Sequence, residues 1–527
     1  MTAHETPAGE SLAPETPAPA DADPHFPALH RVHPRGWLND PNGIIRHDGR
    51  WHVFFQHNPD SARHHLIRWG HMSSPDLVTW RVEPMGPEPR PGTGDADGCW
   101  SGVATLEDGV PHLVYSGVSG GDLALSRVLV SRGDATMRTW EPLPAVAADV
   151  PAEPGIIGVR DPFLFELDSR RLAVQGAGLR RTAADGTERI IPALLAWDRS
   201  DLASWTYLGV VLTGEDPIAA RHIPAELWEC PQLVRLADGD RERWVLTGGK
   251  WRQGHDGAPD TLGGVGYVVG ELTWDDAAGC PRLSPETGGT VDEGPDFYAP
   301  QVCVDGDRAM LWGWSWEGEH RTLEQADEQG WAGCLTFPRE LSLRDGLLVS
   351  APVPELAALR GEALVDDDGV LDLPSPARAE VQTRDGVRVD LIGADGAVVR
   401  TVAEVGAAAG ADETVVLIDA SIVELLPAAA TPQTVRVHPA PGEHLRVSAL
   451  GGGSDLGGGA DLGDGLGPGD GLGPGVGSGL RDGSDLGGGL RLGGGAGPAD
   501  GSGLRDGSEL GGGPGLRAWE LRVPAES

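Results

Sequence analysis

Short apolar runs, separated by turn-forming residues, fill most of the chain between about residues 28 and 345 and restrict it to an all-β architecture. Runs at 51–55, 111–115, 243–247 and 309–314 alternate with clusters of Gly, Pro, Asp and Asn at intervals of about 8–15 residues. The 79 glycines and 43 prolines supply many turns and disfavour long helices. About five repeats of roughly 60 residues, each with four strands, would fit a five-bladed β-propeller, although the spacing alone would also allow four or six blades.

The length of the chain predicts more than one domain. A chain of 527 residues exceeds what a single hydrophobic core usually supports, so we expect two domains. Residues 1–27 are acidic and rich in proline, and we predict a disordered tail there. From about residue 360 the strand-and-turn pattern continues with fewer aromatic residues, which predicts a second all-β domain.

A glycine-rich segment at 451–515 interrupts this second part. About half of its residues are Gly, and the sequence at 477–489 recurs with one change at 501–513. Calcium-binding β-rolls need a regular period of about nine residues, whereas these pieces recur irregularly. Because so little apolar surface cannot offset the entropy of ordering, we predict a disordered insertion. The apolar stretch at 516–523 is predicted to return as a final strand.

Charge and cysteine usage exclude several classes of partner. The net charge of −38 disfavours binding to nucleic acid and to anionic membrane surfaces. The N-terminal residues lack the basic start and apolar run of a secretory signal, and no later stretch is long and apolar enough to span a membrane. The five scattered cysteines are expected to be reduced thiols in a cytoplasmic protein. The sixteen histidines show no metal-ligand spacing, so we expect no metal and no other cofactor, and the sequence leaves the oligomeric state open.

One carboxylate stands in a tight turn, within Trp37-Leu38-Asn39-Asp40-Pro41-Asn42-Gly43. Asn, Pro and Gly around an aspartate predict a turn whose amides hold the carboxylate ionised, as a nucleophile requires. Alone, this motif would more often be an ordinary surface turn than a catalytic one. Two further carboxylates follow in Arg160-Asp161-Pro162 and Trp228-Glu229-Cys230-Pro231.

These three segments, in this order, resemble the β-fructosidase family of glycoside hydrolases, family 32. Other segments that match the family are Phe54-Phe55-Gln56-His57-Asn58-Pro59, Trp69-Gly70-His71, Ser74-Pro75-Asp76-Leu77-Val78-Thr79-Trp80, Trp100-Ser101-Gly102, Asp296-Phe297-Tyr298-Ala299-Pro300-Gln301, and the stretch from Gly330-Trp331-Ala332-Gly333 to Pro338-Arg339-Glu340-Leu341. With so many segments in order across about residues 30–345, the chain is identified as a member of this family.

The resemblance implies a five-bladed β-propeller followed by a β-sandwich. The catalytic propeller would span 28–350, and the sandwich would span 360–527 with the insertion at 451–515 inside it. The segment from Asp419 to Glu424 matches an Asp-x-Ser-x-x-Glu strand of the family's sandwich. We interpret that strand as a structural element or an oligomer contact, because sandwich modules are commonly scaffolds.

The resemblance also assigns three catalytic roles. Asp40 would be the nucleophile that attacks the anomeric carbon of a fructosyl unit, and Glu229 would be the general acid and then the base. Their carboxyl groups are expected about 5–5.5 Å apart, as in retaining enzymes. Ionised Asp40 would raise the pKa of Glu229 and keep its proton available. Asp161 would bind fructosyl hydroxyls rather than react.

The remaining candidates are expected to bind the sugar. Arg160 would orient the carboxylates, although a surface ion pair with Asp161 is the simpler alternative for it. Indole rings suit the C–H faces of sugars, but much of the tryptophan content would serve core packing. Either Trp314 or Trp316 could face the pocket. The predicted substrate-binding residues are Trp37, Leu38, Asn39, Gln56, Trp69, Trp100, Ser101, Arg160 and Trp316.

Substrate choice is left open by one departure from the family. Between Gln56 and Trp69 the usual aromatic segment is replaced by residues 61–68, which include Arg63, His64, His65 and Arg68. These side chains could bind the phosphate of sucrose 6-phosphate or form a solvated loop. The predicted substrates are therefore sucrose, sucrose 6-phosphate or short fructans. The alternatives are a fructan hydrolase or fructosyltransferase, or a catalytically inactive sugar-binding propeller.

Overall fold

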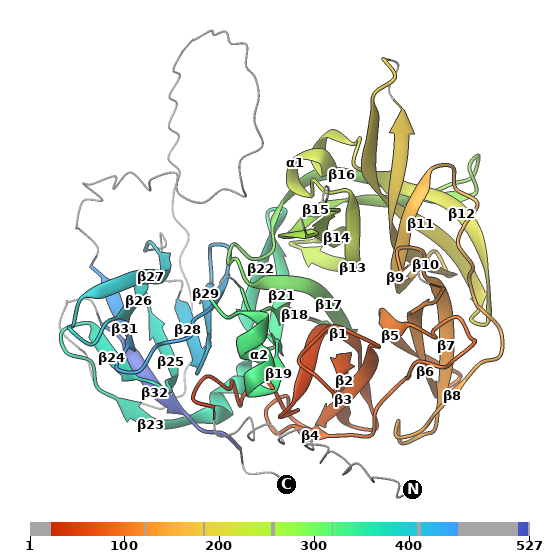
Figure 1. The fold of residues 1–527 in the computed structure, drawn as a ribbon. Helices are drawn as coiled ribbons and strands as arrows, with labels where there is room; N and C mark the ends of the chain where they lie inside the picture. The colour runs from red at the N-terminus through yellow and green to blue at the C-terminus, as the bar shows by residue number, and fades with distance from the viewer. Residues whose placement is uncertain are drawn as a thin grey trace, which may run out of the picture. The chain divides into compact units, whose positions relative to one another are not determined.

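The computed structural model of the chain describes residues 23–120, 123–182, 185–254, 259–318, 320–407, 413–451 and 515–524. Strands make up nearly all of its regular structure, so the all-β prediction is confirmed (Figure 1). Most of the predicted tail and of the predicted insertion lies outside the described residues. Residues 23–27, which the sequence placed in the tail, are instead packed: Phe26 is buried against the Trp331 ring at 5.3 Å, and Asp23 accepts a hydrogen bond from its indole nitrogen.

Five sheets follow one another along the chain from residue 36 to residue 352. All their pairings are antiparallel except that of β19 with β1. The first contains β1 (Gly36–His47), β2 (Arg50–Asn58), β3 (Arg68–Ser74), β4 (Arg81–Val82) and β19 (Trp331–Ala332). The second contains β5 (Gly98–Glu107), β6 (Val110–Val118), β7 (Arg127–Gly133) and β8 (Trp140–Pro142). The third contains β9 (Ile156–Leu167), β10 (Arg170–Thr182), β11 (Glu188–Asp201) and β12 (Ser204–Thr213).

The last two of these sheets complete the series. The fourth contains β13 (Leu227–Asp238), β14 (Arg241–Arg252), β15 (Thr261–Asp275) and β16 (Cys280–Thr290). The fifth contains β17 (Phe297–Asp305), β18 (Arg308–Ser315), β20 (Cys334–Leu335), β21 (Arg339–Arg344) and β22 (Leu347–Pro352). The described residues also form the short helices α1 (Pro217–His222), between the third and fourth sheets, α2 (Leu323–Gln329), between β18 and β19, and the 3-10 helix η2 (Pro354–Leu359), after the fifth sheet.

The first strands of the five sheets form a closed ring. Strand β1 contacts β5, β5 contacts β9, β9 contacts β13, β13 contacts β17, and β17 contacts β1 again. One end of the ring opens into a cavity of about 590 Å³ that residues of all five strands line, among them Ile44, Val103, Phe163, Leu233 and Val302. The five strands therefore surround a common axis.

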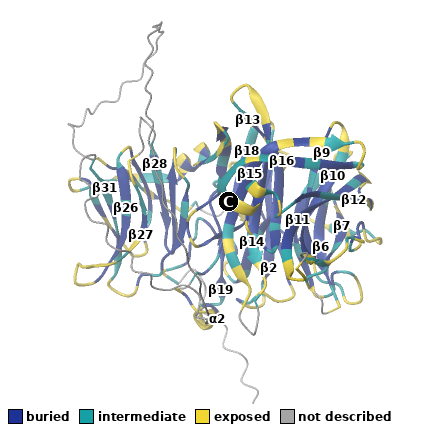
Figure 2. Ribbon diagram, turned by 90° about the horizontal axis from the view of Figure 1, so that it is seen from above, coloured by how far each residue is buried: buried dark blue, intermediate teal, exposed yellow. Residues whose placement is uncertain are grey.

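The middle strands of these sheets are apolar on both faces, because each sheet packs between two others. In β2, residues 51–58 are all buried. Phe54 packs with Trp69 on one side, whereas its neighbour Phe55 packs with Leu38 on the other. This explains why the sequence shows continuous apolar runs rather than a strict alternation. Figure 2 shows the same pattern, with buried residues concentrated in the strands and exposed residues in the loops.

Two further sheets pack face to face over one apolar core after residue 360. One has the order β23-β32-β25-β28-β29-β30 and the other the order β24-β31-β26-β27. The final strand predicted from the sequence is present as β32, between β23 and β25. The bounds are β23 (Arg360–Leu364), β24 (Val370–Pro374), β25 (Arg378–Thr383), β26 (Gly386–Ile392), β27 (Val398–Val405), β28 (Thr414–Asp419), β29 (Ile422–Pro427), β30 (Gln433–Arg436), β31 (His444–Leu450) and β32 (Arg517–Leu521).

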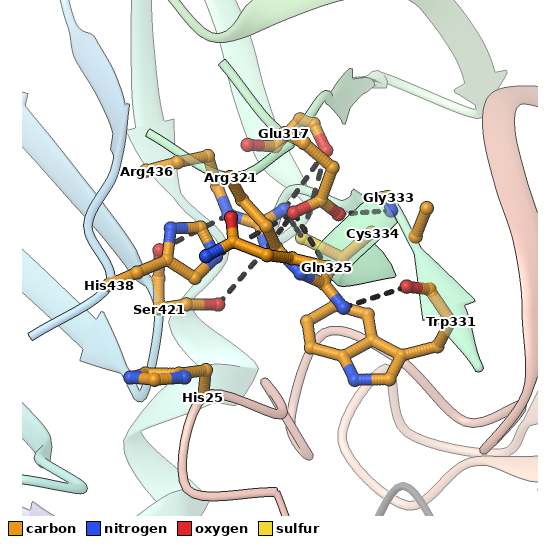
Figure 3. Close-up of polar contacts among 12 residues, drawn as sticks. His25, Glu317, Arg321, Gln325, Trp331, Gly333, Cys334, Ser421, Arg436 and His438 are labelled. Atoms are coloured by element: carbon orange, nitrogen blue, oxygen red, sulfur yellow. Dashed lines mark hydrogen bonds and ion pairs between the residues drawn. The ribbon is translucent and has the colours of Figure 1, made fainter. Parts of the chain in front are cut away.

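Buried ion pairs join these two sheets to the earlier five. Figure 3 shows Arg436 of β30 and Arg321 beside the carboxylate of Glu317, with Arg321 at 2.9 Å and Arg436 at 3.4 Å. The Arg321 guanidinium also stacks over the Trp331 ring at 3.9 Å. Burial opposes the charged form of Glu317, but Arg436, Arg321 and His438 outweigh it and lower the pKa of Glu317 to about 2.

The Asp-x-Ser-x-x-Glu segment belongs to this contact. Asp419 and Glu424 are fully buried, and they accept hydrogen bonds at 2.9 Å from Nδ1 and Nε2 of His30. Glu424 also accepts from Arg339 of β21 at 3.0 and 2.6 Å. The segment therefore has the structural function that we inferred for it from the sequence. None of the helices in the described parts of the chain is long and apolar enough to cross a membrane.

Candidate active site

Each strand of the central ring has an irregularity near its beginning. The pairing register with the second strand of its sheet shifts at residues 38–41 of β1, 100–102 of β5, 160–163 of β9, 229–232 of β13 and 298–301 of β17. A bulge of this kind redirects the side chains that it contains and is common next to active sites. The residues brought together at one end of the ring are thus Asp40, Ser101, Asp161, Glu229, Cys230 and Tyr298.

Three of these bulges contain a non-glycine residue in the left-handed backbone region. The φ angles are 61° at Asp161, 46° at Cys230 and 46° at Ala299, and each residue precedes a proline. Such a conformation is unfavourable for residues with a side chain and is often retained where function requires it. The surrounding ladder on both sides of each bulge holds these conformations in place.

The carboxylate of Asp40 accepts hydrogen bonds on both oxygens. Its Oδ2 accepts from Gln56 Nε2 at 3.0 Å, Ser101 Oγ at 2.5 Å and the Cys230 thiol at 3.4 Å. Its Oδ1 accepts from Asn39 Nδ2 at 2.9 Å. These four donors hold the carboxylate in one orientation. The turn predicted around Asp40 is wrong, because Asp40 lies inside β1, at the bulge between Leu38 and Pro41. Gln56 and Ser101 arrive from β2 and β5.

Glu229 lies in contrasting surroundings on β13. Arg160 approaches Oε1 with Nε at 3.0 Å and Nη2 at 2.9 Å, and the Tyr298 hydroxyl donates to Oε2 at 2.9 Å. Burial raises the pKa of Glu229, and the negative charge of Asp40 adds to this, whereas Arg160 and Tyr298 oppose it. The net shift is upward, so the protonated acid persists to a higher pH than in an ordinary glutamate.

Asp161 is the most deeply buried of the three carboxyl groups, with 6% of the residue exposed. Its Oδ2 accepts a hydrogen bond from the Cys230 backbone N–H at 2.9 Å, and its own N–H donates to Ser116 Oγ at 2.8 Å. Burial raises the pKa of Asp161 to about 7 against the opposing effect of Arg160. The Cys230 backbone thus binds Asp161 while its thiol binds Asp40, which links the carboxyl groups of two strands.

Trp37 and Trp100 are half-buried, and their role as apolar walls of the sugar site stays a prediction. Trp37 donates from its indole nitrogen to Asn39 Oδ1 at 2.7 Å. The Arg160 guanidinium lies 5.9 Å from the Trp100 ring and 5.0 Å from the Trp251 ring, so it is held between two aromatic side chains. Arg160 is buried and pairs with Glu229, so the alternative of a surface pair with Asp161 is wrong.

Two predicted binding residues are buried and support the site from behind. Trp69 has no exposed surface, and its indole donates to the Trp100 carbonyl at 3.1 Å. Leu38 is 1% exposed and packs in an apolar core. Because both side chains are buried, neither offers surface to a sugar in this structure, which contradicts their predicted contact with the substrate.

Trp314 and Trp316 differ in burial. The Trp314 ring lies 5.8 Å from the Trp37 ring and is buried in the apolar core. Trp316 is half-buried and donates to the Pro295 carbonyl at 2.9 Å. Trp314 is therefore the tryptophan used in core packing, and the contact of Trp316 with the sugar stays a prediction.

Sequence reasoning missed Tyr298 and His64 as site residues. Tyr298 could have been found from a repeat, because Asn39-Asp40-Pro41, Arg160-Asp161-Pro162, Glu229-Cys230-Pro231 and Tyr298-Ala299-Pro300 share a proline at the same bulge position. His64 was considered for phosphate binding, but its ring lies 5.9 Å from Trp37 and 5.7 Å from Trp100, at the candidate site itself.

The two arginines of the same loop are already paired with carboxylates. Arg63 forms a two-pronged contact with Asp327 of α2, and Arg68 approaches Asp60 at 3.0 Å. A phosphate group would have to compete with these carboxylates for the guanidinium groups. No cluster of three or more His, Cys, Asp or Glu side chains suited to hold a metal ion occurs among the described residues.

Comparison with known proteins agrees with this arrangement. Residues 30–352 match the model of the glycosyl hydrolases family 32 N-terminal domain. The chain belongs to glycosyl hydrolase family 32. The family prediction from the sequence is therefore confirmed, and the protein is a glycoside hydrolase of the β-fructosidase family.

The alignments with two relatives of named activity cover about two thirds or more of this chain and of each relative. The chain is 32% identical to a sucrose-6-phosphate hydrolase of Salmonella typhimurium over 70% of its own length and 76% of that protein. It is also 32% identical to a raffinose invertase of Escherichia coli, over 64% of its length and 66% of that protein.

Solved structures share the fold at lower identity. A β-fructofuranosidase of Bombyx mori in complex with sucrose has a TM-score of 0.64 at 22% identity, covering 81% of this chain and 91% of that one. A sucrose-6-phosphate hydrolase from Lactobacillus gasseri has a TM-score of 0.65 at 20% identity, covering 82% of this chain and 94% of that one.

Proposed function

We propose that the protein is a β-fructofuranosidase that hydrolyses terminal non-reducing β-D-fructofuranoside residues of sucrose, sucrose 6-phosphate or short fructans by a retaining double displacement. The observation that carries this proposal is the contrast between two carboxyl groups at one end of the ring. Asp40 accepts donors on both oxygens, whereas the pKa of Glu229 is raised. A retaining glycosidase needs one carboxylate and one carboxylic acid in these two states.

The five consecutive sheets would be the blades of a five-bladed β-propeller. The ring of first strands and the cavity shared by all five support this interpretation. We assign the catalytic propeller to residues 28–350 and the β-sandwich to residues 360–527. The active site would then lie at the end of the axis where the bulges are, opposite the cavity at Ile44 and Val302.

Asp40 is the proposed nucleophile. Its Oδ2 is occupied by Gln56, Ser101 and the Cys230 thiol, whereas among the described residues Oδ1 accepts a side-chain hydrogen bond from Asn39 alone. We therefore assign Oδ1 as the oxygen that attacks the anomeric carbon. The donors on Oδ2 fix the orientation of the carboxylate before the attack.

Glu229 is the proposed acid and base. In the first step it protonates the leaving oxygen, which its raised pKa favours. When Asp40 becomes esterified to the fructosyl unit, it loses its negative charge. The contribution of Asp40 that raises the pKa of Glu229 is then removed, so the pKa falls as Glu229 has to accept a proton from water. Arg160 and Tyr298 stabilise the resulting carboxylate throughout.

Asp161 is the proposed partner of the fructosyl hydroxyls. Its Oδ2 accepts a hydrogen bond from the Cys230 backbone N–H. Asp161 is buried, so little water competes with the sugar hydroxyls for its carboxyl group. Hydrogen bonds from sugar hydroxyls to this group would strengthen as positive charge develops on the fructosyl ring. Asn39, Gln56 and Ser101 lie in the same hydrogen-bonded cluster, and Trp37 and Trp100 would form its apolar walls.

The surroundings of residues 61–68 favour a substrate without a phosphate group at this loop. Arg63 and Arg68 are each paired with an aspartate, so we propose that they shape the loop rather than bind phosphate. Fructan hydrolysis and fructosyl transfer use the same carboxyl groups and stay alternatives of the same class. We place the enzyme in the cytoplasm, because all five cysteines are free thiols.

The proposal is tested by product analysis with the full-length protein. Release of fructose from sucrose, sucrose 6-phosphate, inulin and levan would be followed, and the anomer first released from a synthetic β-fructoside would be identified by rapid NMR. We expect β-fructofuranose as the first product, with no release by an Asp40→Asn variant. Binding of sugars without any fructose release by the wild-type protein would instead indicate an inactive sugar-binding propeller.

A further inference from the structure

His64 has contacts at the candidate site that none of the proposed roles uses. It lies in the loop between β2 and β3, where its side chain is exposed toward the site. Its Nε2 lies 3.2 Å from Gln56 Oε1. Its ring also meets the rings of Trp37 and Trp100 edge to face, at 5.9 and 5.7 Å. The imidazole thus stands between the two proposed walls and touches the amide that binds Asp40.

The loop that carries His64 is held in this position by its neighbours. Asn58 Nδ2 donates to the Arg63 carbonyl at 2.9 Å and to Ser61 Oγ at 3.0 Å, and the Ser61 carbonyl accepts from the Trp37 N–H at 2.9 Å. Arg63 adds the contact with Asp327 of α2. The position of the imidazole is therefore set by the loop, because the residues that precede His64 are tied to ordered elements.

The direction of the hydrogen bond between His64 and Gln56 follows from the rest of the network. Gln56 Nε2 lies 3.0 Å from Asp40 Oδ2 and 2.7 Å from Ser101 Oγ. An ionised carboxylate only accepts, so the amide nitrogen of Gln56 must face Asp40 and its oxygen must face His64. That oxygen also only accepts. His64 must then carry its proton on Nε2 and donate it to Gln56 Oε1.

We propose that His64 is a positioning residue: by donating from Nε2 to Gln56 Oε1, it keeps the Gln56 amide nitrogen directed at Oδ2 of the nucleophile Asp40. The inference rests on the proposed function of Asp40. Gln56 is only 3% exposed, so loss of the His64 donor leaves a buried oxygen with a weaker or missing partner. The amide can then rotate or shift, and Asp40 loses part of the support that fixes its attack.

A neutral imidazole suits this role. Desolvation lowers the pKa of His64, while the negative charge of Asp40 acts in the opposite direction. The neutral ring has one N–H, which the network assigns to Nε2.

Two substitutions separate the donor from the ring. His64→Phe keeps an aromatic ring between Trp37 and Trp100 but removes the N–H, whereas His64→Gln removes the ring but can place an amide N–H near the position of Nε2. We expect His64→Phe to lower kcat on a synthetic aryl β-fructoside by about tenfold, the loss of one supporting hydrogen bond, with a smaller change in KM. We expect His64→Gln to recover most of that loss in kcat.

His65→Phe is the matched control, because His65 is exposed at the next position of the same loop. It should leave kcat unchanged, and all three variants should melt at the wild-type temperature. Equal losses of kcat in His64→Phe and His64→Gln would overturn the inference, because an N–H donor would then restore nothing. An unchanged kcat in His64→Phe with a loss in His64→Gln would also overturn it and would point to the ring alone. A wild-type protein that releases no fructose would overturn the proposed function itself, whereas an active wild type with an indifferent His64 would overturn only this inference.

Discussion

The Tyr298 hydroxyl donates to Oε2 of Glu229 at 2.9 Å, on the carboxyl oxygen that Arg160 does not hold. The two contacts act in the same direction, because each stabilises the carboxylate form of Glu229. Burial and the charge of Asp40 act in the opposite direction and prevail, so the pKa of Glu229 is raised. The pKa of this group is thus a balance of contributions from named residues, each of which can be removed separately.

Tyr298→Phe is predicted to shift the alkaline limb of kcat/KM to higher pH. The substitution removes a donor that favours the Glu229 carboxylate, so the pKa of Glu229 rises further. Because the protonated acid is the active form in the first step, activity should persist to higher pH than in the wild type. The pH profile of kcat/KM on sucrose measures this shift. An alkaline limb that stays in place or moves to lower pH would show that Tyr298 does not act on the acid.

Asp40→Ala and Glu229→Ala are predicted to differ in their dependence on the leaving group. Loss of the nucleophile should abolish measurable turnover on every fructoside. Loss of the acid should lower kcat/KM on sucrose by about 10²- to 10⁴-fold. It should lower kcat/KM much less on an aryl fructoside, because that leaving group needs little protonation. Comparing kcat/KM on the two substrates tests this. Equal losses of Glu229→Ala on both would contradict the acid assignment, and circular dichroism would confirm that each variant is folded.

The sequence was sufficient to single out the three carboxyl groups of the candidate site, because they stand in short local motifs. Asp40, Asp161 and Glu229 each lie within two residues of a proline, and the structure places all three in bulges of ring strands. The short apolar runs likewise predicted strands. These features depend on a few neighbouring residues, which a sequence displays directly.

Burial and cross-strand contacts could not be predicted in the same way. Trp69 and Trp100 both lie in family motifs, yet Trp69 is fully buried and Trp100 is half-buried. Their exposure depends on which other strands pack against them, and the local sequence does not display this. The pairing of Arg63 with Asp327 joins residues 264 positions apart, and nothing near Arg63 in the sequence indicates it. The same holds for His30 with Glu424.

Arg63→Ala and Arg68→Ala are predicted to leave the preference between sucrose and sucrose 6-phosphate nearly unchanged. Both guanidinium groups already contact aspartates, and exposed pairs of this kind contribute little to binding or stability. The ratio of kcat/KM for the two substrates, measured for wild type and variants, is the test. A selective loss of activity on sucrose 6-phosphate in either variant would restore the phosphate-binding interpretation of this loop.

Glu424→Gln is predicted to destabilise the protein strongly, because Glu424 is buried and holds Arg339 and His30. Removing one member of a buried ion pair leaves its partners uncompensated and costs about 3–5 kcal/mol. Urea unfolding of the wild type and the variant at neutral pH measures this cost. The exposed Glu141 provides the matched control, since Glu141→Gln should leave the urea midpoint unchanged.

The difference between wild type and Glu424→Gln should also depend on pH. Burial opposes the charge of Glu424, but Arg339 and His30 outweigh it and lower the pKa in the folded state. A carboxyl group whose folded pKa is depressed contributes stability above its unfolded pKa of about 4.3, and this contribution is lost as the pH falls through the folded value. The free energy of unfolding of the wild type should therefore exceed that of Glu424→Gln by the full amount at neutral pH, and this difference should shrink below about pH 4.3. A difference that stays constant, or grows, on acidification would contradict an ionised Glu424 in the folded protein and would assign the destabilisation to packing alone.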